Sequence, residues 1–292
     1  MRIAILGPTA SGKSALAAAV ARRVGAAVVN GDPFQAFRGL EIGTGQPTEA
    51  EQGGVAHEGY GVLDLAERPN PTSFGALARR WLEPLDRAVL VTGSGLYLRG
   101  IWNQLSELPE VPGSLVARVR VLGARLGTPR LHRYLAAVDP GRAADLHPHD
   151  GARVQRALAL HLATGRRPSE LLTGVAPPPE GWRALLVLPA RERQRARVAA
   201  RVAAQLAAGW REEVRRLVAE GHGEDLRALR PLGYDVLLDE GLPPAEAEAR
   251  IVQATRAYAK RQSTWFRNQL AHAPAWDPDA EPLDRAFERL GL

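Results

Sequence analysis

The sequence predicts an α/β protein with a doubly wound parallel sheet and an inserted helical subdomain. Three observations in its 292 residues favour this fold. Short apolar runs alternate with helical patterns in the N-terminal third, and a glycine-rich loop joins the first run to a helix. The middle of the chain is helical and rich in arginine. Strands that alternate with helices are typical of parallel sheets with helices on both faces.

The expected strands are short apolar runs, at residues 3–6, 26–30, 62–65, 88–91 and 183–188. The expected helices carry apolar residues at helical spacing. The first begins at Ser14, and the others span residues 74–85, 191–208, 210–220 and 245–270. We assign residues 1–104 and 181–292 to a catalytic core and residues 105–180, bounded by prolines, to the inserted subdomain. The last twenty residues show little pattern.

The loop after the first expected strand has the phosphate-loop pattern. It reads Gly7-Pro8-Thr9-Ala10-Ser11-Gly12-Lys13-Ser14. Gly7 and Gly12 permit conformations that turn successive N–H groups towards an anion, and the helix start adds its positive dipole end. In such loops the lysine reaches the phosphates and the Ser14 hydroxyl ligates Mg²⁺. The loop therefore predicts a P-loop NTPase-like core. The plain alternative is a glycine-rich turn that only caps a helix.

Composition limits the class of protein. There is no cysteine, and no apolar run approaches the roughly 20 residues that span a bilayer. No signal peptide is visible, so we expect a cytoplasmic protein with no membrane partner. The net charge of +6 permits a polyanionic partner. Lys13 and Lys260 are the only lysines, and an ammonium kept at the phosphate loop fits a need for a compact point charge.

Two polar residues follow expected strands. Asp32 is the only acidic residue directly after an early strand, and Ser94 follows the strand at 88–91. The carboxyl ends of parallel strands share one edge, so we expect both residues near the phosphate loop. Asp-Pro is also turn chemistry, so a structural role for Asp32 stays open. These residues alone are compatible with a phosphate-ester transferase, with a kinase, or with an RNA-binding module that has no chemistry.

Six segments resemble tRNA dimethylallyltransferases in the same order. They are the loop 7–14, the Asp32–Thr44 segment (D-S-x-Q-x-Y-R-x-M-D-I-G-T in the family), 92–97 (G-G-T-x-L-Y), 153–158 (R-x-x-R-A-L), 231–234 (x-x-G-Y) and 254–267 (A-T-R-x-Y-A-K-R-Q-x-T-W-F-R). The chain departs from the family at Pro33, Phe37, Ser94 and Asp235, and the last of these reverses a charge.

The resemblance implies transfer of a dimethylallyl group from dimethylallyl diphosphate to tRNA. The acceptor is N6 of the adenine 3′ of the anticodon in tRNAs that read codons starting with U, and pyrophosphate leaves. Asp32 is then the general base, for which an ordinary pKa of about 3.9 suffices because N6 becomes acidic as the C–N bond forms. Ser94 donates to the leaving diphosphate or relays a proton, with a hydroxyl that only satisfies its own turn as the plain alternative, and Mg²⁺ is the expected cofactor.

The resemblance also implies binding residues. The diphosphate lies on Gly7–Ser14 with Arg197 and Arg201, which share a helix face, although the whole segment is arginine-rich. The metal ligand is Ser14. The tRNA anticodon stem-loop contacts Asp32, Pro33, Phe34, Gln35, Ser94, Arg153, Val154, Gln155, Arg156, Gly233, Tyr234, Lys260, Arg261 and Arg267. Gln35 pairs with the base edge, and we expect a monomer. The simpler interpretation of the basic segments is a solvated helix face.

Overall fold

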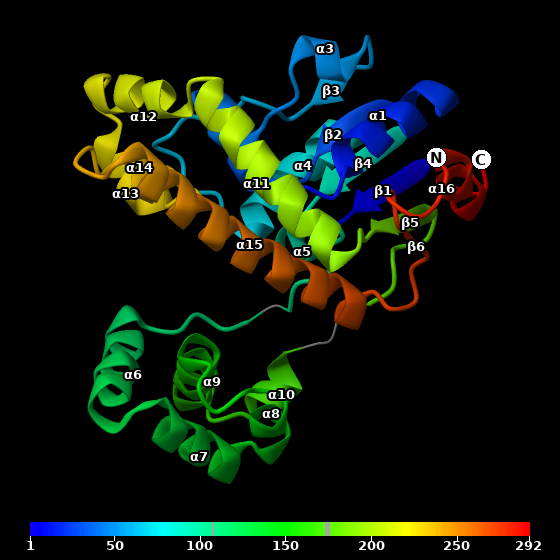
Figure 1. Ribbon diagram of the computed structural model, residues 1–292. Coiled ribbons are helices and arrows are strands. Elements are labelled where there is room, and N and C mark those ends of the chain that lie inside the picture. Colours follow the sequence, from blue (N-terminus) through cyan, green and yellow to red (C-terminus); the bar gives the residue numbers. More distant parts are fainter. Residues whose placement is uncertain (107, 173–175) are drawn as a thin grey trace. The chain divides into compact units, whose positions relative to one another are not determined.

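The computed structural model describes residues 1–106, 108–172 and 176–292 (Figure 1). These residues form two compact units. The first contains Met1–Gln104 and Val175–Leu292, and the second contains Leu105–Gly174. The second unit ends at Gly174, six residues before the predicted end of the inserted subdomain at residue 180. In the described ranges, no helix combines the length and the apolar character needed to cross a membrane.

The first unit is built on a parallel sheet with strand order β3-β2-β4-β1-β5-β6. Every neighbouring pair is parallel, so the predicted parallel α/β sheet is confirmed. In the central strand, Ile3 lies opposite Val89 on one side and Arg183 on the other. The strands are β1 (Arg2–Leu6), β2 (Ala27–Asn30), β3 (His57–Glu58), β4 (Ala88–Thr92), β5 (Trp182–Val187) and β6 (Ala275–Trp276).

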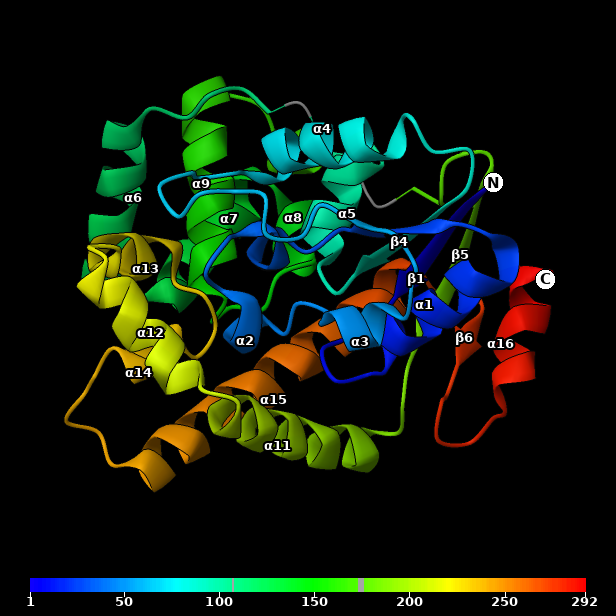
Figure 2. The same cartoon turned by 90° about the horizontal axis from the view of Figure 1, so that it is seen from above.

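Helices cover both faces of this sheet (Figure 2). Successive side chains of a strand point to opposite faces. Ile3 and Ile5 therefore pack with α1 (Lys13–Val24) and α16 (Leu283–Leu290) on one face. Ala4 and Leu6 pack on the other face with α4 (Pro71–Leu82) and α5 (Gly95–Ile101). A run of apolar residues buried on both sides is what a central parallel strand requires.

The long helices α11 (Arg191–Ala207) and α15 (Pro244–Gln269) lie side by side over the carboxyl edge of the sheet (Figures 1 and 2). Both agree with the expected helices to within one residue at each end. The short elements that complete this unit are η1 (Pro33–Ala36), α2 (Glu41–Thr44), α3 (Glu49–Gln52), α12 (Trp210–Ala219), α13 (Gly223–Leu229) and α14 (Tyr234–Leu237).

The structure corrects the sequence predictions at three places. Residues 62–65 form no strand, because Val62 and Leu63 donate their N–H groups to the Ala36 carbonyl in a loop, at 2.7 and 2.8 Å. The helix expected at 74–85 begins earlier, at Pro71, because the Asn70 side chain caps the N–H groups of Thr72 and Ser73. The C-terminal residues, which show little pattern, form β6 and α16 and complete one sheet face.

The regular secondary structure among the described residues of the second unit is entirely helical. Its core contains Val119, Leu131, Leu135, Val154 and Leu158. These residues recur at helical spacing, which is the pattern that predicted a helical insert. The helices are α6 (Gly113–Leu126), α7 (Thr128–Val138), α8 (Pro140–Ala144), α9 (Gly151–Thr164) and α10 (Pro168–Leu171).

Candidate active site

The phosphate loop runs from the end of β1 to the start of α1. Gly7 passes so close to β5 that a Cβ atom would lie 2.5 Å from the Val187 carbonyl oxygen. Gly12 has a φ of 89° and precedes α1, and no side chain caps the start of this helix. The Ser11 hydroxyl is buried and has no partner within the described residues. The loop therefore offers N–H groups to an anion, while the Ser11 hydroxyl is buried.

Lys13 is half-buried beside the site carboxylate and a second cation. Its Nζ donates to the Pro8 carbonyl at 3.3 Å. Burial, and after it the nearby Arg201 guanidinium, lower the pKa of Lys13 to about 8, although Asp32 opposes both effects. Because a bound anion favours the charged ammonium, anion binding near pH 8 would draw a proton onto the fraction of Lys13 that is neutral.

Asp32 stands at the end of β2 and caps η1. One of its carboxylate oxygens accepts from the Phe34 N–H at 3.0 Å, and its own N–H donates to the Asn30 side chain at 2.8 Å. Burial raises the pKa of Asp32, against the opposing effects of Lys13, the Phe34 N–H and Arg201. The expectation of an ordinary pKa is therefore wrong, because the carboxylate is removed from bulk water. Asp32 is a turn residue that caps η1, and its carboxylate lies near the Lys13 ammonium of the phosphate loop.

Thr92, at the end of β4, ties three strand ends together. It accepts from the Gly7 N–H at 3.3 Å, and its hydroxyl donates to the Gly31 carbonyl at 2.7 Å. The same hydroxyl oxygen accepts from the Ser94 N–H at 3.1 Å. The phosphate loop, Asp32 and Ser94 therefore meet at one edge of the sheet. The Ser94 side chain makes no capping hydrogen bond to α5.

Two buried glutamines brace the phosphate loop. Neither was predicted from the sequence. Gln262 on α15 accepts from the Thr9 N–H at 2.9 Å and donates to the Gly93 carbonyl at 2.8 Å. Gln194 on α11 donates to the Thr9 carbonyl at 3.2 Å. A usable signal was present, because Gln262 has helical spacing to the buried Ala259 and Phe266. A polar residue at a core position needs a hydrogen-bond partner.

Arg197 and Arg201 differ in their surroundings although they lie one turn apart. Arg201 donates to the Thr44 carbonyl at 3.0 Å, and its pKa is lowered by burial but raised by Asp32. Arg197 pairs with Asp279 at 2.5 Å and donates to the Ser11 carbonyl at 3.4 Å. Arg201 therefore faces the site carboxylate, whereas Arg197 is engaged by the C-terminal segment and braces the loop.

The predicted RNA contacts divide into exposed and buried residues. Lys260, Arg261, Arg267, Arg153 and Arg156 are exposed, and Phe34 and Gln155 are half-buried. The side chains of Pro33, Val154 and Tyr234 and the backbone at Gly233 are buried.

Two of the buried side chains are engaged within the protein, and their predicted contacts with RNA remain predictions. Val154 packs in the core of the second unit. The Tyr234 hydroxyl donates to the buried Glu213 carboxylate at 2.6 Å. A sequence motif marks a neighbourhood but does not say which of its side chains point outward.

Gln35 is half-buried and already holds a neighbouring loop. Its amide nitrogen donates to the carbonyls of Thr44 and Gly45, at 3.1 and 2.8 Å. The predicted pairing of Gln35 with both the donor and the acceptor of an adenine edge is therefore not available in this conformation. Only its carbonyl oxygen remains as a partner for a base.

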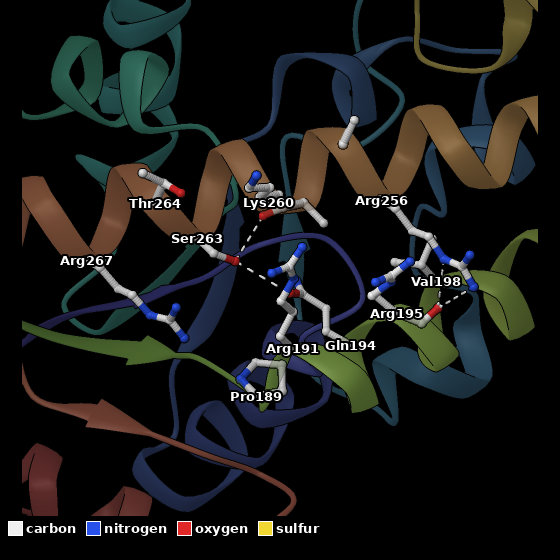
Figure 3. Close-up of a pocket in the computed structure, with 12 residues that line it drawn as sticks. Pro189, Arg191, Gln194, Arg195, Val198, Arg256, Lys260, Ser263, Thr264 and Arg267 are labelled. Carbon is white, nitrogen blue, oxygen red and sulfur yellow. Dashed lines mark hydrogen bonds between the residues drawn. The ribbon is translucent and has the colours of Figure 1, made fainter.

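A groove of about 300 Å³ lies between α11 and α15 (Figure 3). None of the described residues that line it is acidic. Gln194 forms part of its wall, so the groove borders the phosphate loop. Its cationic side chains are Arg191, Arg195, Arg256, Lys260 and Arg267. Such a groove suits phosphate groups.

Comparison with known proteins assigns the family. A model of IPP transferases matches residues 35–269, which is more than half of the chain, and a model of isopentenyl transferases matches residues 1–58. The chain belongs to the IPP transferase family. The resemblance seen in the sequence motifs is thereby confirmed.

This IPP transferase is similar to a tRNA dimethylallyltransferase from Rhodospirillum centenum, with 44% identity over 93% of this chain and 90% of that protein. A tRNA dimethylallyltransferase from Anaeromyxobacter sp. is 39% identical over 95% of this chain and 96% of its own length. The fold is similar to that of the full-length tRNA isopentenylpyrophosphate transferase from Bacillus halodurans, with a TM-score of 0.70, 28% identity and coverage of 99% and 94% of the two chains.

Proposed function

We propose that this IPP transferase moves a dimethylallyl group from dimethylallyl diphosphate to N6 of an adenine in tRNA, 3′ of the anticodon. The observation that carries the proposal is the convergence of Lys13, Arg201 and Asp32 at one edge of the sheet. The two cations suit the diphosphate, and the carboxylate suits the removal of a proton. A passive RNA-binding module would have no use for a base and a hydroxyl beside the phosphate loop.

The residues supply the parts of a substitution reaction. N6 attacks C1 of the dimethylallyl group while the C1–O bond breaks, and pyrophosphate leaves with the bonding electrons. Asp32 takes the proton from N6, and its raised pKa makes it a stronger base than a surface carboxylate. Ser94 donates a hydrogen bond to the departing oxygen. Lys13, Arg201 and the N–H groups of the loop stabilise the charge that develops on the diphosphate.

The donor set fits a magnesium ion held mainly by the substrate. Ser14 offers a hydroxyl in the first turn of α1. Among the described residues, no group of three or more acidic, histidine or cysteine side chains is placed to hold a metal. Mg²⁺ at phosphate sites commonly takes one or two protein oxygens and completes its shell with phosphates and water. When bound, it would neutralise charge on the diphosphate.

The basic surfaces suit the anticodon stem-loop. The groove with Lys260 and Arg267, and the exposed Arg261, offer charges to backbone phosphates, as do Arg153 and Arg156 of the second unit. The adenine must leave its stack to reach Asp32, at a cost of a few kcal/mol that phosphate contacts offset. A single chain supplies all the reacting groups, so we propose a monomer, acting in the cytoplasm with its tRNA.

The test follows two labels in parallel. Protein and bulk tRNA are incubated with Mg²⁺ and either dimethylallyl diphosphate labelled in the prenyl group or ATP labelled in the γ-phosphate. We expect prenyl label in the tRNA and no phosphate transfer. Transfer of phosphate without prenyl transfer would replace the proposal by a kinase, and transfer of neither label would favour a passive RNA-binding module.

A further inference from the structure

The one-turn helix α2 is capped by a residue from a distant part of the chain. Its own N-cap residue is Leu40, which has no side-chain oxygen and makes no cap. Glu213 on α12 supplies the cap, because its carboxylate accepts from the N–H groups of Ile42 and Gly43 at 2.7 and 3.2 Å. The Tyr234 hydroxyl donates to the same carboxylate at 2.6 Å. Glu213 is only 5% exposed and Tyr234 is fully buried, whereas Ile42 and Gly43 are half-buried.

The other end of α2 holds two residues of the site. The Thr44 carbonyl accepts from Arg201 at 3.0 Å and from Gln35 at 3.1 Å. The Gly45 carbonyl accepts from Gln35 at 2.8 Å. Each of these hydrogen bonds depends on the direction of the carbonyl groups at the C-terminal end of α2.

Close packing prevents α2 from shifting alone. A Cβ atom at Gly43 would lie 2.1 Å from the Trp210 indole nitrogen and 2.5 Å from the Tyr234 ring. Gln205 holds the outer side of the helix by donating to the carbonyls of Ile42 and Gly43, at 2.7 and 3.0 Å. The helix therefore transmits any change in its cap to the carbonyl groups at its far end.

We propose that Glu213 is a positioning residue that sets the place of Arg201 in the phosphate site through α2. The link runs from the Glu213 carboxylate to the N–H groups of Ile42 and Gly43, and from the Thr44 carbonyl to the Arg201 guanidinium. That the anion is a diphosphate rests on the proposed function, but the link itself does not.

The number of hydrogen-bond donors around Glu213 requires a carboxylate at this position. Three hydrogen-bond donors converge on one side chain, and an ionised carboxylate accepts at both of its oxygens. Burial raises the pKa of Glu213, while the bonds from Tyr234, Ile42 and Gly43 oppose that shift and Glu41 adds to it. A glutamine of the same shape would turn an NH₂ group towards at least one donor, which leaves a buried polar group unpaired.

The test is a double-mutant cycle on binding of inorganic pyrophosphate, measured by calorimetry. We expect Glu213→Gln to weaken pyrophosphate binding about tenfold, and to weaken it less than twofold in an Arg201→Ala background, because residues in one network couple. The matched control is Glu212→Gln, a neighbour on the same helix whose side chain is 67% exposed. It should leave binding unchanged. We also expect a higher KM for the diphosphate with a smaller change in kcat.

Each outcome separates this role from the proposed function. An equal loss from Glu213→Gln in both backgrounds would overturn the positioning role, because it would show a general structural effect. Should that variant fail to fold, Glu213→Asp withdraws the carboxylate from α2 while keeping its charge, and the same coupling is expected. If the unaltered protein binds no pyrophosphate, the proposed function fails too. If it prenylates tRNA but shows no coupling, only the positioning role fails.

Discussion

Lys13 and Asp32 shift each other's pKa across the carboxyl edge of the sheet. Burial disfavours the charge on both groups, and the attraction between them opposes this for each. Arg201 acts on the same pair, by repelling the ammonium and attracting the carboxylate. An entering diphosphate would therefore meet the cations Lys13 and Arg201 next to a carboxylate that holds a proton more readily than usual.

Binding of pyrophosphate should weaken as the pH rises through about 8. The pKa of Lys13 is lowered to about 8 from an ordinary value of 10.5, so the charge on its side chain is lost above that pH. Calorimetry between pH 6 and pH 10 measures the decline. The Lys13→Arg variant keeps its side-chain charge between pH 6 and pH 10. Its affinity for pyrophosphate, although lower than that of the unaltered protein, should therefore not fall as the pH rises. A flat profile for the unaltered protein would contradict the assigned role of Lys13.

Asp32→Asn should lower turnover on tRNA by roughly 10²–10⁴-fold, the range typical of a lost general base. The amide oxygen still caps the Phe34 N–H, so the fold is preserved. Asp64→Asn is the matched control, since Asp64 is an exposed partner of Arg38. Single-turnover assays of the unaltered protein and of both variants measure the effect. Near-normal turnover of Asp32→Asn would show that Asp32 is only a turn residue.

Removing charges from the groove should weaken tRNA binding and lower its dependence on salt. For Lys260→Ala and Arg267→Ala we expect the slope of log affinity against log salt to fall by about one unit for each lost phosphate contact. Arg285→Ala serves as the control, because Arg285 is exposed but paired with Glu288. Unchanged slopes in both groove variants would show that these side chains are only solvated.

Gln35→Ala should reduce prenyl transfer to tRNA at least tenfold and should also weaken pyrophosphate binding slightly. Gln35 shares the Thr44 carbonyl with Arg201, so its loss loosens that loop as well as removing an oxygen from the base site. Parallel measurement of transfer rate and pyrophosphate affinity separates the two effects. Full transfer activity would exclude a contact between Gln35 and the base.

Patterns in neighbouring residues were enough to predict the phosphate loop, Asp32 and Ser94 as parts of one site. The phosphate loop is read from adjacent residues, and the convergence of Asp32 and Ser94 follows because parallel strands end at one edge. The helices α11, α12 and α15 carry apolar residues at helical spacing, so their bounds are predicted to within one residue.

Contacts between segments that lie far apart in the chain could not be predicted from the sequence. Gln262 lies 253 residues from Thr9, and Glu213 lies 171 residues from Ile42. No pattern along the chain encodes such pairings. The raised pKa of Asp32 also depends on burial that only the folded chain creates. Motif matching likewise placed Tyr234 beside RNA, although its side chain is fully buried.

The most direct test of the central claim is to find where the prenyl group goes. Purified protein is incubated with Mg²⁺, dimethylallyl diphosphate, and either tRNA or AMP, and nuclease digests are analysed by mass spectrometry. The account predicts N6-isopentenyladenosine at the nucleotide 3′ of the anticodon and almost no modified AMP, because AMP lacks the stem-loop that the basic surfaces hold. Efficient prenylation of AMP, with tRNA left unmodified, would contradict it.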